Sequence, residues 1–302
     1  MKTKIAALML AACLSQSVCV GSKVLLLPAL PDAKVPVMDG TLQDPLWQQA
    51  AALDLGETVM QLRPAVAGSA TTLRMLVGNG NLYLGFECRF PPEYLPQSRM
   101  REHDAPVFED ESIEFFIAPD GRPGEGGYYH FAVNSRGSMT ERRNFDPAWN
   151  AEWQGAVKVG EDRWTATLTV PLAALVDGGP GGHYWRINTC RNIYDGRGAF
   201  VQGMTLARPG YYHPGIPLLV GPVGAPELLS AVNAALAEME GVFRPHLSGA
   251  IKRQYDRLIG YRKELEAADA AVPVEKAAVI LETALDNAGR LEDMIIWNYM
   301  FE

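Results

Sequence analysis

The residues with the most evident chemical potential are four acids that lie close together in the chain. They are Glu109, Asp110, Glu111 and Glu114. Paired carboxylates hydrolyse glycosidic bonds when two of them face each other across a sugar cleft and the pKa of one is raised. Three adjacent acids at the entrance of a strand are instead typical of a solvated rim. This run therefore does not predict a glycosidase.

The histidines and the glycine-rich stretches give no further catalytic motif. None of the five histidines has the His-Glu-x-x-His or His-x₃-His spacing of zinc sites. The sequence also lacks a Gly-x-Ser-x-Gly elbow, a Walker loop and a Gly-x-Gly-x-x-Gly after a strand. The glycine-rich residues 121–127 lead into a strand and are interpreted as a hairpin loop. Enzymatic activity is not expected.

Two pairs of residues are suited to contact a ligand without changing it. Trp149 and Trp153 flank a loop-to-strand transition, where one indole could face solvent and stack on a sugar ring. Arg191 and Asn192 end a predicted strand and offer hydrogen-bond donors there. A salt-bridged sheet edge is the alternative for the second pair.

The elements that must position these residues are short strands. Polar, glycine-containing turns at 78–81, 135–138 and 160–162 predict three hairpins. The predicted strands are 71–77, 82–90, 112–118, 128–134, 139–144, 151–159, 163–170 and 184–192. Many short strands with no long helix between them predict an antiparallel β-sandwich over residues 23–225.

Residues 226–302 have a different composition and period. They contain only four of the 29 glycines, and apolar residues recur every three or four positions. Pro226 and Pro273 stand at first-turn positions, and Pro245 interrupts the pattern between them. The tail is therefore predicted to be a helical hairpin or a three-helix region.

The N-terminus and the charge restrict location and partners. Two lysines before the apolar residues 5–14 predict a secretory signal peptide over residues 1–21. Leu-Ala-Ala-Cys, ending at Cys13, is similar to a lipobox, while ordinary cleavage after Cys19 or Gly21 is the alternative. The chain is expected to be secreted, periplasmic or lipid-anchored at a bacterial envelope. A net charge of −8 without a Lys/Arg run argues against nucleic acid as a partner, and no apolar stretch after residue 22 is long enough to span a membrane.

Two cysteines remain after the predicted signal peptide. Cys88 and Cys190 lie in strand-like segments 102 residues apart. Export permits a disulfide between them, and two buried thiols are the alternative. No Cys-x-x-Cys motif suggests a zinc ribbon or thioredoxin chemistry.

Six blocks in the front region occur in the order found in one protein family. They are residues 39–47, 82–86, 108–117, 129–134, 164–175 and 185–188. On these blocks the region resembles the family 9 carbohydrate-binding modules and their sugar-binding relatives in exported bacterial proteins. The tail lies outside the resemblance. Trp47, Trp164 and Trp185 are expected in the core, with Asp44 as the N-cap of a short helix.

The resemblance implies a sugar held between two aromatic walls, with polar groups bonded to its hydroxyls. The first wall maps onto Phe108, where sugar-binding members carry Trp. Glu114 matches an acidic hydroxyl acceptor. The block with Asn134 supplies a further polar contact, although the Arg that members carry two residues before it is here Ala132.

The second wall falls in the loop after Asn192. Phe200, Tyr194 and Tyr211 are its candidates, and no Trp is present there. A phenyl ring offers less stacking area than an indole. These departures weaken the expected clamp and leave the expected fold unchanged.

The resemblance also suggests two groups that the chain could hold. Asp146 and Asp195 could join backbone carbonyls in a structural calcium site, although no compact acidic loop is present. Related sandwiches bind b-type haem through Met and His, so Met139 and His130 are a remote alternative. A core methionine and a surface histidine are the plainer interpretation.

The predicted function is non-catalytic carbohydrate binding by an exported module that serves polysaccharide recognition or breakdown by partner enzymes. The alternative is a structural protein whose sandwich has lost sugar binding. In that case the helical tail would dock a protein partner or self-associate.

Overall fold

The computed structural model describes 16 stretches of the chain between residues 25 and 284. They are residues 25–27, 29–31, 34–55, 57–61, 68–91, 94–118, 128–175, 184–195, 197–205, 216–220, 225–243, 249–268, 272–273, 276–277, 279–281 and 283–284. The predicted signal peptide and Cys13 lie outside these residues. The described residues form two compact units, one ending at Val220 and one beginning at Ala225.

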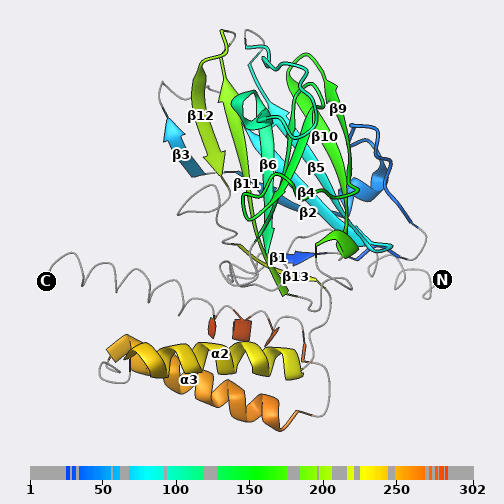
Figure 1. Ribbon diagram of the computed structural model, residues 1–302. Helices are drawn as coiled ribbons and strands as arrows, with labels where there is room; N and C mark the ends of the chain where they lie inside the picture. Colours follow the sequence, from blue (N-terminus) through cyan, green and yellow to red (C-terminus); the bar gives the residue numbers. More distant parts are fainter. Residues whose placement is uncertain are drawn as a thin grey trace, which may run out of the picture. The chain divides into compact units, whose positions relative to one another are not determined.

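The first unit is a sandwich of two β-sheets (Figure 1). The larger sheet has the order β1 (Leu25–Leu27), β13 (Ile216–Val220), β11 (Tyr184–Tyr194), β6 (Ser112–Ala118), β7 (Tyr129–Asn134) and β8 (Met139–Arg143). It is extended by β12 (Phe200–Thr205) on β11 and β3 (Glu57–Gln61) on β12. The smaller sheet has the order β2 (Ala51–Asp54), β4 (Thr71–Gly78), β5 (Asn81–Arg89), β10 (Arg163–Pro171) and β9 (Gln154–Val159).

This topology confirms the predicted fold class and all eight predicted strands. The three predicted hairpins are β4–β5, β7–β8 and β9–β10, each paired antiparallel. Five strands were not predicted: β1, β2, β3, β12 and β13. Most of them have three to six residues, too short for a period-two pattern to stand out from loop sequence.

The main core lies between the two sheets, and the three tryptophans that were expected in the core are all buried. Trp164 and Trp185 are fully buried between the sheets. Trp47 is buried on the other side of the smaller sheet in the 3₁₀ helix η1 (Pro45–Gln48), whose N-cap Asp44 accepts a hydrogen bond from Leu46 N. A side chain at Gly85 would meet Trp47 at 3.1 Å, so the glycine permits this close packing.

The second unit contains two long helices, α2 (Ala225–Phe243) and α3 (Gly249–Glu266), which lie side by side (Figure 1). The described residues between 276 and 284 are also helical. The buried residues of α2 include Leu228, Val232, Leu236 and Met239, four of the five apolar residues of the predicted face, while Leu229 is partly buried. No helix in the described stretches has the length and apolar character needed to cross a membrane. A partner for this unit stays a prediction.

Cys88 and Cys190 are both buried thiols that form no disulfide, so the predicted possibility of a disulfide is wrong. Period-two alternation explains this. Cys88 points into the core between the sheets, whereas Cys190 bonds to Thr205 on the opposite face of the larger sheet. The two thiols therefore lie in different layers of the sandwich.

Candidate functional site

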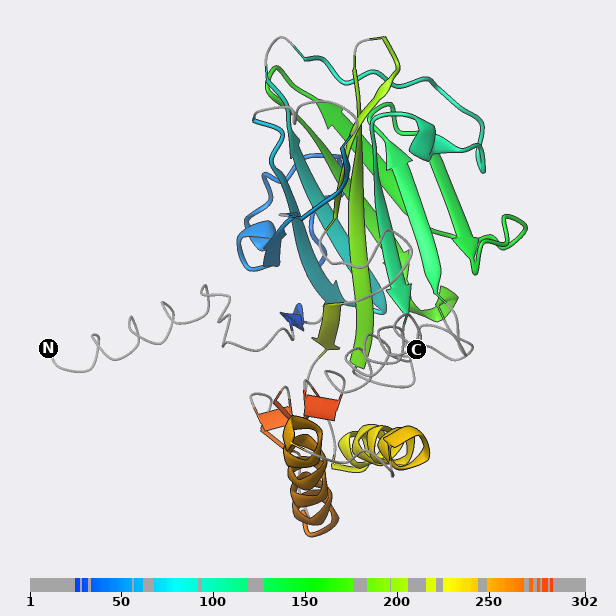
Figure 2. The same cartoon turned by 90° about the vertical axis from the view of Figure 1, so that its left-hand side faces the viewer.

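Alternation along β6, β7 and β11 sorts the predicted site residues onto two faces of the larger sheet. Ile113, Phe115 and Phe131 point into the core. Their neighbours in sequence point the other way, onto the outer face that Figure 2 presents to the viewer. The outer-face residues with polar side chains include Ser112, Glu114, His130, Asn188, Asn192 and Thr205.

Three of these polar side chains form one cluster on the outer face. Asn192 Nδ2 donates to Glu114 Oε1 at 2.7 Å and to Ser112 Oγ at 3.3 Å. His130 Nε2 lies 2.8 Å from Glu114 Oε2, but its geometry makes no hydrogen bond. The His130 ring stacks on Phe116 with centroids 4.3 Å apart. Glu114, which the resemblance assigned to a sugar hydroxyl, and Asn192, the polar candidate at the end of the predicted strand, thus lie side by side.

The cluster is nearly covered, which differs from the expected open clamp. Glu114, His130 and Asn192 are each at most 6% exposed. A buried carboxylate is costly unless it is paired, and here the Asn192 amide and the His130 ring supply the partners. Glu114 and Asn192 therefore form a floor rather than an accessible rim.

The two predicted aromatic walls come together through Tyr194. Phe108 lies half-buried in η2 (Val107–Glu109), and its carbonyl accepts a hydrogen bond from Tyr194 Oη at 3.1 Å. The ring of Tyr194 packs edge-on against Phe200, with centroids 5.4 Å apart. We refer to Phe108, Tyr194 and Phe200 as the aromatic rim; sugar binding between Phe108 and Phe200 stays a prediction.

A hollow of about 420 Å³ opens beside this rim. Its lining residues are Gln97, Ser98, Arg99, Glu109, Asp110, Tyr194, Arg197 and Gly198. Burial and the nearby Glu109 raise the pKa of Tyr194, so its hydroxyl stays a neutral donor. The hollow therefore combines a ring, two guanidinium groups and two carboxylates.

Asp110 is the most firmly held of the lining residues. Arg101 Nε donates to it at 2.6 Å, and Asn134 Nδ2 donates at 3.1 Å. Burial opposes ionisation of Asp110, but these hydrogen bonds outweigh it and lower the pKa of the carboxyl. The solvated rim predicted for the acidic run is therefore wrong for Asp110 and Glu111, which are buried, and right only for Glu109.

Arg191 has a structural position, not one beside a ligand. It points into the sandwich, is fully buried and pairs with Glu111 at 2.7 Å. It also donates to Thr71 Oγ1 and to the carbonyls of Ser69 and Arg89. Burial opposes the charge, but Glu111 outweighs it and raises the pKa of the guanidinium. The salt-bridge alternative is the one that the structure supports.

Asn134 also has its hydrogen-bonding capacity fully used within the protein. Its Nδ2 donates to the carbonyl of Arg99 and to Asp110, and its Oδ1 accepts from Arg136 N and Ser138 N. An amide side chain has two donors and two acceptor positions, and all four are engaged here. Asn134 closes the β7–β8 turn and has no group left for a sugar hydroxyl.

The tryptophans of the loop-to-strand transition lie apart from the rim. Trp149 is half-buried against Tyr129 and Phe131. Trp153 is buried, and its Nε1 donates to Glu141 at 2.8 Å. Of the two, only Trp149 keeps surface that a ligand could contact.

The two candidate groups suggested by the resemblance meet different outcomes. Asp146 Oδ1 accepts from Ala148 N, and Asp195 Oδ1 accepts from Ala199 N, so each carboxylate caps its own turn. Calcium binding by them stays a prediction. Haem ligation by Met139 and His130 is wrong, because Met139 packs against the core while His130 lies on the outer face.

Arg142 is the residue that sequence reasoning missed. It pairs with His130 across β7 and β8, its Nε is buried without a hydrogen bond, and its guanidinium lies 5.2 Å from the centre of the Phe108 ring. It thus supplies a cation near the position where the resembled family carries an Arg and this chain has Ala132. Counting outward from the predicted turn 135–138 would place Arg143 opposite His130, whereas the observed register pairs His130 with Arg142, so the hairpin pattern did not identify this residue.

Solved structures that align with this chain include two of family 9 carbohydrate-binding modules. A family 9 module from Caldicellulosiruptor kristjanssonii in complex with cellotriose aligns with a TM-score of 0.50 and 13% identity, over 65% of this chain and 93% of that one. A second structure of such a module from that organism, in complex with glucose, aligns with a TM-score of 0.50 and 12% sequence identity. The alignment covers 66% of this chain and 95% of that one. A Bacteroides uniformis protein, provisionally named carbohydrate-binding, aligns with a TM-score of 0.51 and 18% sequence identity. The alignment covers 66% of this chain and 100% of that one.

The sandwich therefore has the family 9 carbohydrate-binding-module fold. At these identities the likeness establishes the fold alone. No protein-family model and no curated protein matches the sequence.

Proposed function

We propose that the sandwich binds carbohydrate without catalysis, at the aromatic rim and the adjoining hollow. The observation that carries this proposal is the hollow of about 420 Å³ that is lined by Tyr194, whose hydroxyl bonds to the Phe108 carbonyl and whose ring packs on Phe200. Pockets of about 300–1,000 Å³ are usual for small ligands. The likeness to modules that hold glucose and cellotriose supports the same choice.

The lining suits a sugar chemically. A pyranose presents apolar C–H groups that pack on a ring such as Phe108 or Phe200. Its hydroxyls need charged or amide partners, which Arg99, Glu109 and Arg197 offer around the hollow. The Arg142 guanidinium lies 5.2 Å from the centre of the Phe108 ring, and the Glu114–Asn192 pair lies on the same outer face of the larger sheet as Arg142. Nothing in this arrangement breaks a bond, because no two free carboxylates face each other across the described hollow.

The biological setting that we propose follows from the predicted signal peptide. An exported module of this kind would hold a polysaccharide at the cell envelope while partner enzymes act on it. The tail would then join the module to other components of the same system.

The test is a glycan array followed by calorimetric titration, with glucose and cellotriose as the first probes. Phe108→Ala is expected to weaken binding by about 3- to 10-fold, the value of one aromatic contact. Asn192→Ala is expected to weaken it about 10-fold or more, because it leaves the Glu114 carboxylate without its amide partner. Melting temperatures show whether either variant is merely unfolded.

Two matched variants serve as controls. Phe145→Ala removes an exposed phenyl ring, and Asn150→Ala removes an exposed amide, both away from the hollow. Both are expected to bind like the wild type. Absence of binding across the array, or equal binding by Phe108→Ala and Phe145→Ala, would remove the proposal.

A further inference from the structure

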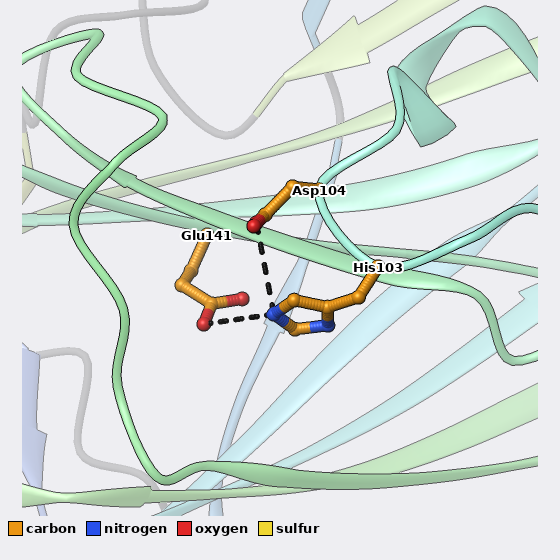
Figure 3. Close-up of side chains that lie close together, drawn as sticks. All are labelled: His103, Asp104 and Glu141. Atoms are coloured by element: carbon orange, nitrogen blue, oxygen red, sulfur yellow. Dashed lines mark hydrogen bonds and ion pairs between the residues drawn. The ribbon is translucent and has the colours of Figure 1, made fainter.

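Three metal-binding side chains from two distant segments converge at the edge strand β8. His103 and Asp104 lie in the loop before η2, and Glu141 lies on β8 (Figure 3). Their ligand atoms are all within 4.8 Å of one another. Glu141 is fully buried, while the side chain of His103 is half-exposed. None of these residues belongs to the aromatic rim or lines the hollow.

Hydrogen bonding alone does not account for the arrangement. His103 Nε2 lies 3.2 Å from Glu141 Oε1 and 3.6 Å from Asp104 Oδ1 (Figure 3). One ring nitrogen carries at most one proton, so it can serve only one of the two carboxylates well. Asp104 Oδ1 is sealed from solvent and accepts no hydrogen bond. Glu141 Oε1 also accepts from Ala151 N at 3.2 Å, so Asp104 Oδ1 is the oxygen that lacks a hydrogen bond, and a cation at the centre of the three residues would bind it.

The backbone and the surroundings hold the ligand atoms in place. Asp104 has φ +65°, in the left-handed region that a non-glycine residue adopts only when its surroundings require it. Its N–H bonds to the carbonyl of Met139 on β8. The second oxygen of Glu141 accepts from Trp153 Nε1 at 2.8 Å, the kind of outer hydrogen bond that orients a metal ligand.

We propose that His103, Asp104 and Glu141 bind a divalent transition-metal ion of the zinc class. Ligands at about 2.0–2.2 Å from Zn²⁺ are separated by about 3.3–3.6 Å along a tetrahedral edge, close to the 3.2 Å and 3.6 Å that separate His103 Nε2 from the oxygens of Glu141 and Asp104. An imidazole with two carboxylates suits zinc, whereas calcium takes six to eight oxygen ligands. Three protein ligands leave a fourth position for water.

The ion would fasten the loop 97–106 to β8 and to the segment that carries Trp153. This loop leads directly into Phe108, and Arg142 follows Glu141 in sequence. The metal site therefore does not depend on sugar binding. The bound ion would nevertheless fix the positions of Phe108 and Arg142 relative to each other.

The test is titration of the chelator-treated protein, without a histidine tag, with Zn²⁺ by calorimetry and with Co²⁺ by visible absorption. We expect one tight equivalent and the intense d–d bands of a low-coordinate cobalt ion. His103→Ala and Asp104→Asn are each expected to lower the affinity at least about 10-fold. Asn tolerates the left-handed backbone, so Asp104→Asn removes the ligand charge and preserves the loop.

Glu102→Gln is the matched control, since it removes an exposed acid next to the site. It is expected to bind Zn²⁺ like the wild type, and all three variants are expected to melt normally without metal. Other histidines can bind Zn²⁺ weakly, so the contrast between variants decides the assignment. Absence of a tight equivalent, or a tight equivalent that survives both His103→Ala and Asp104→Asn, would overturn the proposal.

Discussion

Each face of the larger sheet carries a buried glutamate bonded to a polar residue of β11, but the two pairs have different bonding partners. On the inner face Glu111 and Arg191 are fully buried, and together they bond to Trp164, Thr71, Ser69 and Arg89 from the smaller sheet and its flanks. On the outer face Glu114 and Asn192 bond to each other, while the nearby His130 Nε2 and Arg142 Nε make no hydrogen bond. The inner pair bonds to residues of both sheets and so joins the two layers. The outer pair bonds only between neighbouring strands of the larger sheet and joins no second layer.

The largest expected effect comes from breaking the inner pair. Arg191→Leu leaves the Glu111 carboxylate buried without its cation, and we expect it to lower the free energy of unfolding by about 3–5 kcal/mol. Asn192→Ala, one residue along the chain, is expected to cost only about 1–3 kcal/mol, the value of one hydrogen bond to a charged group. Urea denaturation of both variants measures the difference. Equal losses would mean that the two faces do not differ as described.

A smaller effect is expected at Asp110, which borders the hollow. Its pKa is lowered in the folded protein, so it contributes stability above the pKa of the unfolded carboxyl, about 3.9, and the contribution is lost as the pH falls below that value. Asp110→Asn is therefore expected to have a lower free energy of unfolding than the wild type at pH 7. This difference in free energy is expected to become smaller towards pH 3. Urea denaturation across that range measures it. A gap that stays constant with pH would contradict the assignment.

The smallest effect is expected from the two thiols. Burial raises the pKa of Cys88 to about 12 and that of Cys190 well above its usual range. For Cys88 this leaves a thiolate fraction of about 10⁻⁴ at pH 8. Neither cysteine is expected to react with iodoacetamide in the folded chain without residues 1–21, and both should react in denaturant. Peptide mass spectrometry reads each site separately. Labelling of Cys190 alone would show that the outer face opens independently of the core.

The sequence predicted the fold well because alternation is a local signal. Residues 112–118 form β6 with the predicted bounds, and the turn residues at 78–81 and 135–138 gave the correct hairpins. Alternation was not applied to Arg191 and Asn192, which were treated as one pair. Adjacent residues of a strand face opposite ways, so one is structural and the other is on the outer face.

The site was harder to predict because its parts come from segments with no fixed spacing. The hollow joins the loop 97–99 to residues 109–110 and 194–198, and only the pairing of β6 with β11 brings these together. The histidine spacing likewise gave no metal site, since His103 and Glu141 are 38 residues apart and meet through the folded loop. Arg142 could not be placed from the predicted turn at 135–138 either, because the observed pairing of Val133 with Met139 shifts the register by one residue.

The parallel pairing of β1 with β13 has a consequence for how the protein is presented. Leu25–Leu27 lies against Leu218–Val220, so the sandwich starts and finishes on one margin of the larger sheet, with β8 at the opposite margin. A lipid or other tether upstream of Leu25 would hold the module by that margin. The opposite margin, which carries Arg142 and the residues His103, Asp104 and Glu141, would then be the one farther from the point of attachment.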